Sequence, residues 1–177
     1  VDAFHFGFPI FEFARTAHQQ KTAISARGEE STTTFTHRTR LADHTARSVT
    51  TPNNDTIYSS ARLDLTNGPT LIDLPSAADR YYSVAFMNAF TDNFAFVGTR
   101  ATGGVGGRFL VIGPNWHGER PAGAQIIRSS SNDVWALARI GVAGADDLEA
   151  AASVQRQIRI ISAASPAPLT IAPSEAS

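Results

Sequence analysis

The sequence lacks cysteine and contains one lysine, Lys21, and one methionine, Met87. Without cysteine, the chain can form no disulfide bond, thiolate metal site or cysteine nucleophile. It also has no run of about 18 apolar residues, which a membrane-spanning helix requires. The 15 Lys and Arg residues nearly balance the 16 Asp and Glu residues, so the net charge of −1 lacks the basic excess typical of nucleic-acid binding.

The hydrophobic content of 42% over 177 residues is typical of a globular chain that folds around its own core. We predict one domain over residues 1–162, followed by a Pro- and Ala-rich tail over residues 163–177. The five histidines show no close metal-ligand spacing, so we predict no metal site. We also predict no cofactor.

Short β-prone runs separated by Gly, Pro, Asn and Asp recur through the middle of the chain. They cover residues 56–65, 70–74, 80–90, 94–99, 108–112, 125–128 and 134–142. This spacing predicts an α+β, mainly β fold, in which about seven strands form an antiparallel sandwich or barrel with an N-terminal and a C-terminal helix. The glycines of residues 103–107 predict a hairpin loop. The residues expected in the core include Phe86, Val97, Leu110, Val111 and Leu137.

Helical patterns occupy the two ends of the domain. The first helix is predicted over residues 3–25, with a kink near Pro9 and an end before Gly28. The second is predicted to begin at Asp146, with Glu149 completing a capping box. Its expected inner stripe consists of Leu148, Ala151, Ala152, Gln155 and Ile158. Between the first helix and the first long strand, residues 29–51 predict an irregular connection with one β-prone run at 33–36.

The first helix carries more aromatic surface than one sheet can cover. Phenylalanine occupies positions 4, 6, 8, 11 and 13, and a helix displays these around more than one face. Two interpretations follow. Either the surplus rings meet a membrane anchor, a second copy or a partner domain, or all of them are buried within one compact domain.

The most distinctive polar string begins at Pro52 and continues with Asn53, Asn54, Asp55 and Thr56. Its side chains can form an Asx-turn that fixes the loop, hold a polar ligand, or bind a Ca²⁺-like ion through oxygen. On the Asx-turn interpretation, Asn54 and Asp55 hold the loop through hydrogen bonds to the backbone. On the ligand interpretation, the candidate binding residues are Asn53, Asn54, Asp55, Tyr58, Arg100 and His37.

His37 is a candidate general base in such a site, and a surface or turn histidine is the alternative. Tyr58 can be a cross-strand packing residue, and Arg100 can pair with a carboxylate or bind an anionic ligand group. No Gly-x-Ser-x-Gly elbow occurs, and no set of residues completes a nucleophile, base and oxyanion donor. The catalytic residues therefore stay unassigned.

The motifs in their order resemble the DUF1254 family. The resemblance begins with Phe6-Gly7-Phe8-Pro9, continues with His37-Arg38 and the string from Pro52 to Ser60, and extends to about residue 161. Its later parts are Asp79-Arg80-Tyr81-Tyr82-Ser83, Thr91-Asp92-Asn93-Phe94-Ala95, Gly98-Thr99-Arg100, Val111-Ile112-Gly113-Pro114-Asn115-Trp116, Gly118, Ile127-Arg128-Ser129 and Asn132-Asp133-Val134-Trp135.

The resemblance implies a β-rich domain with flanking helices that is often fused to, or encoded beside, a DUF1214 domain. Many such domains carry a secretion signal or membrane anchor, which implies a periplasmic or membrane-associated location on the outer side. We therefore expect an envelope protein that binds a ligand or assembles with a DUF1214-type partner or another envelope complex, with membrane association through a segment outside this chain. The alternative is a hydrolase of a polar or carbohydrate-like substrate, with its site near Asn53, Asn54 and Asp55.

Overall fold

The computed structural model describes residues 1–25, 34–43 and 53–162. Within these residues the chain forms two α-helices, one 3₁₀-helix and nine strands. In chain order they are α1 (Asp2–Ser25), β1 (Thr36–Arg38), β2 (Thr56–Asp64), β3 (Thr70–Leu74), β4 (Tyr82–Asn88), β5 (Asn93–Gly98), β6 (Gly107–Ile112), β7 (Ala124–Arg128), β8 (Asp133–Gly141), η1 (Ala145–Asp147), α2 (Leu148–Gln155) and β9 (Arg159–Ser162). Gly28 and residues 163–177 lie outside the described residues.

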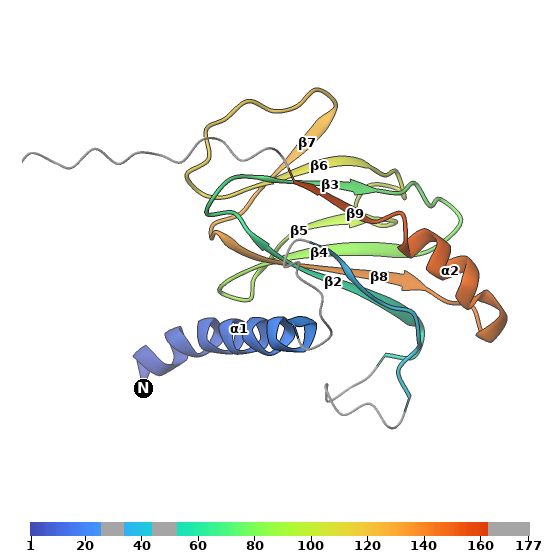
Figure 1. Ribbon diagram of the computed structural model, residues 1–177, viewed down its shortest axis with the longest axis horizontal. Helices are drawn as coiled ribbons and strands as arrows, with labels where there is room; N and C mark the ends of the chain where they lie inside the picture. The colour runs from blue at the N-terminus through green and yellow to red at the C-terminus, as the bar shows by residue number, and fades with distance from the viewer. Residues whose placement is uncertain (26–33, 44–52, 163–177) are drawn as a thin grey trace, which may run out of the picture.

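The strands form two sheets that pack face to face (Figure 1). Sheet A has the order β1-β2-β8-β4-β5, and sheet B has the order β7-β6-β3-β9. Neighbouring strands are antiparallel except β6 and β7, which run parallel. The sheets do not close into a barrel, so the sandwich form of the predicted mainly β fold is confirmed. β1 and β9 add two short edge strands to the seven expected ones.

The alternation of side chains along β2 explains how sheet A divides its two faces. Ile57, Ala61 and Leu63 are buried against sheet B, whereas Tyr58 and Arg62 lie on the outer face. Phe86, Val97 and Val111 belong to the same core, as expected. Leu110 is also buried, but in a second cluster with Ile112 and Ala124 on the outer side of sheet B. The prediction for Leu137 is wrong, because this residue faces outward beside Trp135 and is half-buried.

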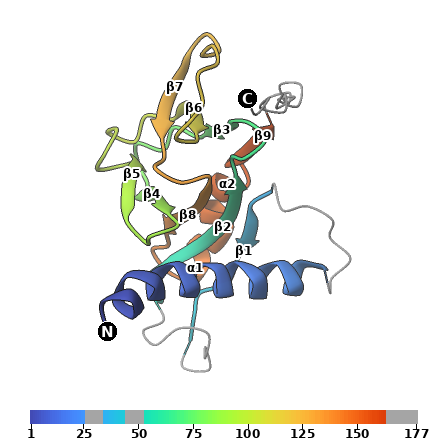
Figure 2. The same ribbon diagram turned by 90° about the vertical axis from the view of Figure 1, so that its left-hand side faces the viewer.

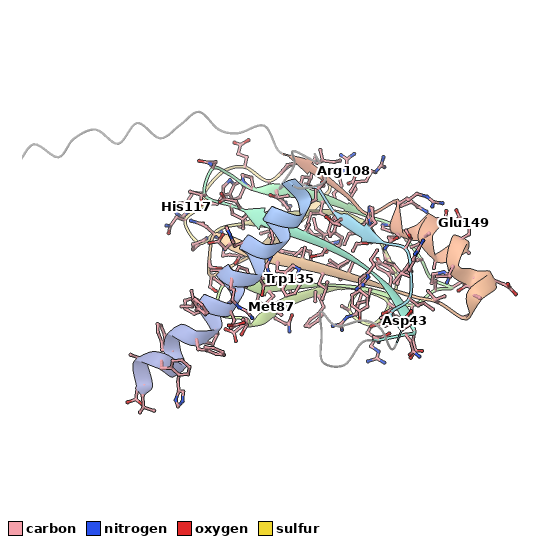
Figure 3. All side chains as sticks on the ribbon, turned by 60° about the horizontal axis from the view of Figure 1, so that its bottom comes forward. Asp43, Met87, Arg108, His117, Trp135 and Glu149 are labelled. Atoms are coloured by element: carbon pink, nitrogen blue, oxygen red, sulfur yellow. The ribbon has the colours of Figure 1, made fainter. Side chains whose placement is uncertain are left out.

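α1 extends through Pro9 without interruption and lies across the outer face of sheet A, on the side away from sheet B (Figure 2). It passes beside Met87 and Trp135 (Figure 3), and its N-terminal end extends past the edge of the sheet (Figure 1). In the part of the chain that the structure describes, no helix has the length and apolar character needed to cross a bilayer.

Three local predictions are wrong. The expected capping box of Asp146 and Glu149 does not form, because η1 precedes α2 and the N-cap residue is Asp147, whose side chain bonds elsewhere. α2 ends at Gln155, so Ile158 is buried beyond the helix, where the chain turns into β9. The glycine-rich residues 103–107 form no hairpin loop, because they connect β5 of sheet A to β6 of sheet B.

Candidate functional site

The polar string before β2 is an Asx-turn built by Asn53. Its side-chain Oδ1 accepts hydrogen bonds from the backbone N–H of Asp55 at 2.7 Å and of Thr56 at 3.1 Å. The Thr56 hydroxyl donates to the same oxygen at 3.3 Å. The prediction that Asn54 and Asp55 supply these hydrogen bonds is therefore wrong, and the amide one residue earlier holds the turn.

Asn54 and Asp55 are exposed. The backbone carbonyl of Asp55 accepts a hydrogen bond from Val142 N–H at 2.9 Å, which fastens the start of β2 to the end of β8. Among the described residues, no group of three or more acidic or histidine side chains could hold a metal ion.

His37 contacts a buried hydroxyl on the inner side of sheet A. Its Nδ1 lies 2.8 Å from Ser59 Oγ, and its ring stacks on Phe35 at a centroid distance of 6.4 Å. Desolvation in this position lowers the pKa of His37, although part of the ring stays exposed. Ser59 has no exposed surface, so a substrate carbonyl cannot reach its hydroxyl. The pair therefore joins the three-residue strand β1 to β2.

Gln155 reinforces the same strand pair from α2. The side chain is fully buried, and its Nε2 donates to the Tyr58 carbonyl at 2.9 Å and to the Arg38 carbonyl at 3.3 Å. A glutamine in the predicted inner stripe of α2 was a sequence signal for such a contact, because a buried amide needs hydrogen-bond partners.

Tyr58 lies on the opposite, outer face of sheet A. It is half-buried, and the guanidinium carbon of Arg139 on β8 lies 5.7 Å from its ring centroid. Arg38 of β1 is the cross-strand neighbour of Tyr58 on its other side. Tyr58 and His37 therefore occupy different faces of the sheet, although they come from adjacent register positions.

Arg100 follows β5 and is exposed. It lies at the same end of sheet A as Asn53, but β8 and β4 separate β2 from β5. The structure thus places the six sequence-derived candidates in four locations. Asn53, Asn54 and Asp55 form the turn before β2, His37 and Tyr58 lie on opposite faces of the β1–β2 pair, and Arg100 lies three strands away.

Sequence reasoning missed the ion pair of Arg80. Its two terminal nitrogens donate to the two carboxylate oxygens of Asp147 at 2.5 Å each, and one of them also donates to the Gly141 carbonyl at 2.8 Å. Asp147 accepts a further hydrogen bond from Ala143 N–H at 2.8 Å. The Arg80 guanidinium, followed by this backbone hydrogen bond, lowers the pKa of Asp147 to about 2.

Gly98 and Thr99 hold the other side of the same sheet end. Thr99 Oγ1 accepts a hydrogen bond from Tyr82 N–H at 2.9 Å and donates to the Arg80 carbonyl at 3.2 Å. Gly98 has a φ of +135°, and an added Cβ would lie 2.3 Å from the Tyr82 carbonyl oxygen. The geometry of this strand end therefore accounts for Gly98 and Thr99 of the Gly98-Thr99-Arg100 motif.

An aromatic clamp on Arg62 fixes α1 to sheet A. The guanidinium carbon lies 4.1 Å from the ring centroid of Phe13 in α1 and 4.4 Å from that of Trp135 in β8. Trp135 Nε1 donates to Ser60 Oγ at 2.7 Å, which fixes the indole ring. Burial lowers the pKa of Arg62 to about 10, so the side chain remains charged near neutral pH.

These contacts define an open two-sheet sandwich domain whose motif residues hold its turns and strand ends in place. The chain belongs to the DUF1254 family, described as a protein of unknown function, whose model matches residues 32–162. None of the curated proteins compared with the chain matches it.

Among solved structures, the chain is similar to the crystal structure of the VPA0106 protein from Vibrio parahaemolyticus, with a TM-score of 0.76 and 24% sequence identity. The match covers 97% of this chain and 41% of that chain, so this chain spans less than half the length of that relative. At this identity the similarity shows a shared fold.

Proposed function

We propose that this domain is an assembly module of the bacterial envelope, which binds a DUF1214-type domain through an aromatic patch on α1. We define the aromatic patch as the rings of Phe4, Phe8 and Phe11, which lie on one side of α1. Their exposed fractions are 64%, 46% and 60%, and Phe6 on the other side of the helix is 71% exposed. The interpretation that all of these rings are buried within one compact domain is therefore wrong.

The main observation behind this proposal is that α1 carries aromatic side chains on two opposite sides. At about 100° per residue, Phe6 and Phe13 share one side, and Phe4, Phe8 and Phe11 share the other. The first side meets sheet A, since Phe13 is buried on Arg62 and Phe6 lies 6.1 Å from Phe90 between ring centroids. The second side faces away from the sheet, and one sheet can cover only one side of a helix.

A group of exposed aromatic rings on one side of a helix is typical of an interaction surface, because water solvates aromatic rings poorly. Two facts favour a DUF1214-type domain as its occupant. The motifs resemble a family whose members are often fused to, or encoded beside, such a domain. In addition, well over half of the VPA0106 chain lies outside the match, which leaves room in that relative for another domain.

Sedimentation velocity tests the proposal. The chain is measured alone and mixed with a DUF1214-type domain from the same genome, and the mixture should sediment as one faster complex. The double variant Phe8→Ser/Phe11→Ser should fold normally, because both rings are exposed, and should lose at least about tenfold in affinity. The control is Ile126→Ser, which removes a residue of 45% exposure from β7 in sheet B and should bind like the unchanged chain.

Three outcomes would overturn the proposal. The first is that the two proteins sediment separately, and the second is that the double variant binds as tightly as the control. The third is self-association of the chain through the same rings, which would make a second copy the occupant.

A further inference from the structure

The outer face of sheet A carries a cross-strand row of two arginines with a tyrosine between them. Arg38 of β1 pairs with Tyr58 of β2, and Tyr58 pairs with Arg139 of β8, so the three side chains share one face. Both arginines are exposed, and Tyr58 is half-buried. In the part of the chain that the structure describes, neither arginine forms an ion pair with a carboxylate.

Sheet B contains a matching row in which the central residue is acidic. Asp73 of β3 pairs with Arg108 of β6 on one side and with Arg159 of β9 on the other. Asp73 Oδ1 lies 3.3 Å from Arg108 Nε, so this row supplies its own anion. The row of sheet A has the same two cations and has a tyrosine ring in place of the carboxylate.

On the two strands that carry Tyr58 and Arg139, the acidic side chains of this face lie far from the row. On this face, the acidic residues of β2 and β8 are Asp64 and Asp133. They are cross-strand neighbours in the register at the far end of the two strands. They are six residues from Tyr58 and Arg139, which corresponds to about 20 Å along a strand. α1 crosses this face beside Met87 and Trp135 (Figure 3). Arg139 comes four residues after Trp135, near the end of β8 that leads to α2.

We infer that the row of Arg38, Tyr58 and Arg139 binds an oxyanion group, carboxylate or phosphate, carried by a small organic molecule with a flat apolar part. Guanidinium groups bind such oxyanions through paired N–H donors. The two arginine Cα atoms are about 10 Å apart across two strand spacings, so both side chains can reach one anion above Tyr58. The Arg139 guanidinium already lies over that ring.

Neighbouring side chains fit the flat part of such a ligand. Ser83 of β4 continues the row beyond Arg139, and Tyr81 Oη donates to its hydroxyl at 3.3 Å. Tyr81 is 40% exposed and Phe96, in the next row, is 52% exposed. The site therefore combines two cations, hydroxyl groups and aromatic rings on one sheet face. It is separate from the aromatic patch, so the two proposals can fail independently.

Calorimetric titration with small probes tests the inference. Benzoate and phenyl phosphate carry the oxyanion on a ring, benzamide is the neutral match, and inorganic phosphate lacks the ring. We expect both ring oxyanions to bind, benzamide not to bind, and inorganic phosphate to bind more weakly than phenyl phosphate. Equal binding of inorganic and phenyl phosphate would overturn the assignment of an organic ligand.

Substitutions in the row distinguish binding of the probe at this site from general attraction of anions to the positive charges of the surface. Arg38→Gln and Arg139→Gln should each weaken benzoate binding at least about tenfold, because each removes half of the cationic pair. Arg159→Gln is the matched control on sheet B and should leave binding unchanged. Tyr58→Asp should abolish binding, because it places a carboxylate between the two arginines, as Asp73 does in sheet B. The melting midpoint of Tyr58→Asp should be no lower than that of Tyr58→Ala.

The inference is overturned if benzamide binds as well as benzoate, if no oxyanion probe binds, or if Arg159→Gln weakens binding as much as Arg139→Gln. Unchanged benzoate binding by folded Tyr58→Asp would also overturn it. Circular dichroism of each variant shows whether it folds, and the two single arginine variants change only exposed side chains.

Discussion

Arg80 and Asp147 form a bidentate ion pair that joins residues 67 positions apart in the chain. Arg80 stands two residues before β4, and Asp147 ends η1 before α2. Because Arg80 also donates to the Gly141 carbonyl and Asp147 accepts from Ala143 N–H, the pair organises the whole connection from β8 to α2. The connection in turn positions Gln155, which fastens β1 to β2.

The first prediction concerns acid stability. The ion pair lowers the pKa of Asp147 from 3.8 to about 2, so its stabilisation is complete above about pH 4 and is lost as the pH falls through 2. Asp147→Asn should lower the melting midpoint at pH 6, and its difference from the unchanged chain should shrink between pH 4 and pH 2. Thermal melts across this range measure both effects.

The control for this prediction is Glu149→Gln. Glu149 pairs with Arg156 in an exposed setting, with 82% of the Glu149 side chain accessible, and such pairs contribute little. Its melting midpoint should follow that of the unchanged chain at every pH. A constant offset of Asp147→Asn down to pH 2 would contradict the assigned titration.

The second prediction concerns the turn before β2. Asn53→Ala removes the oxygen that accepts from Asp55 and Thr56, and should lower the free energy of unfolding by about 1 kcal/mol. Asn54→Ala and Asp55→Ala change exposed side chains and should stay within about 0.5 kcal/mol of the unchanged chain. Denaturant titration of the three variants distinguishes Asn53 as the residue that holds the turn.

The fold was predictable where each strand carries its own signal. The seven expected strands agree with β2 to β8 within about two residues, because alternation and flanking Gly, Pro or Asn mark each of them. β1 and β9 are three and four residues long, too short for an alternation to stand out. They form because other elements bind them: β1 through Ser59 and Gln155, and β9 through pairing with β3.

The candidate site was less predictable for a related reason. Asn53, Asn54 and Asp55 drew attention because they are polar and adjacent, and adjacency is what an Asx-turn needs. The arginine row and the Arg80–Asp147 pair join residues from distant parts of the chain, so only the strand register and the packing of α2 bring them together. Residue type alone could not separate Arg139 from the other arginines.

The third prediction concerns the strand end at Gly98. An alanine Cβ there would lie 2.3 Å from the Tyr82 carbonyl oxygen, at a φ of +135° that other residues rarely adopt. Gly98→Ala should therefore cost at least about 3 kcal/mol of unfolding free energy, or prevent folding. The control, Gly103→Ala, also has a positive φ of +62° but meets nothing within 4 Å, and should cost about 1 kcal/mol. Equal losses in the two variants would show that backbone conformation alone, and not the close approach to Tyr82, sets the cost.

The last prediction concerns how α1 is held on sheet A. Phe13 is buried at 7% exposure against Arg62, whereas Phe11, two residues earlier, is 60% exposed. Helices in proteins owe most of their stability to the packing of one face, so loss of this contact should release α1. Removal of a buried phenylalanine costs about 3 kcal/mol, which corresponds to roughly a hundredfold faster amide exchange.

Hydrogen exchange of Phe13→Ala should therefore speed up about a hundredfold in α1. The core strands β2 and β8 should keep their protection, because their buried faces pack on sheet B and not on the helix. Phe11→Ala, the matched control, should leave the exchange of α1 unchanged, because its ring faces away from the sheet. If β2 and β8 lose protection together with α1 in Phe13→Ala, the helix and the sandwich unfold as one unit, and the description of α1 as a separately docked element is wrong.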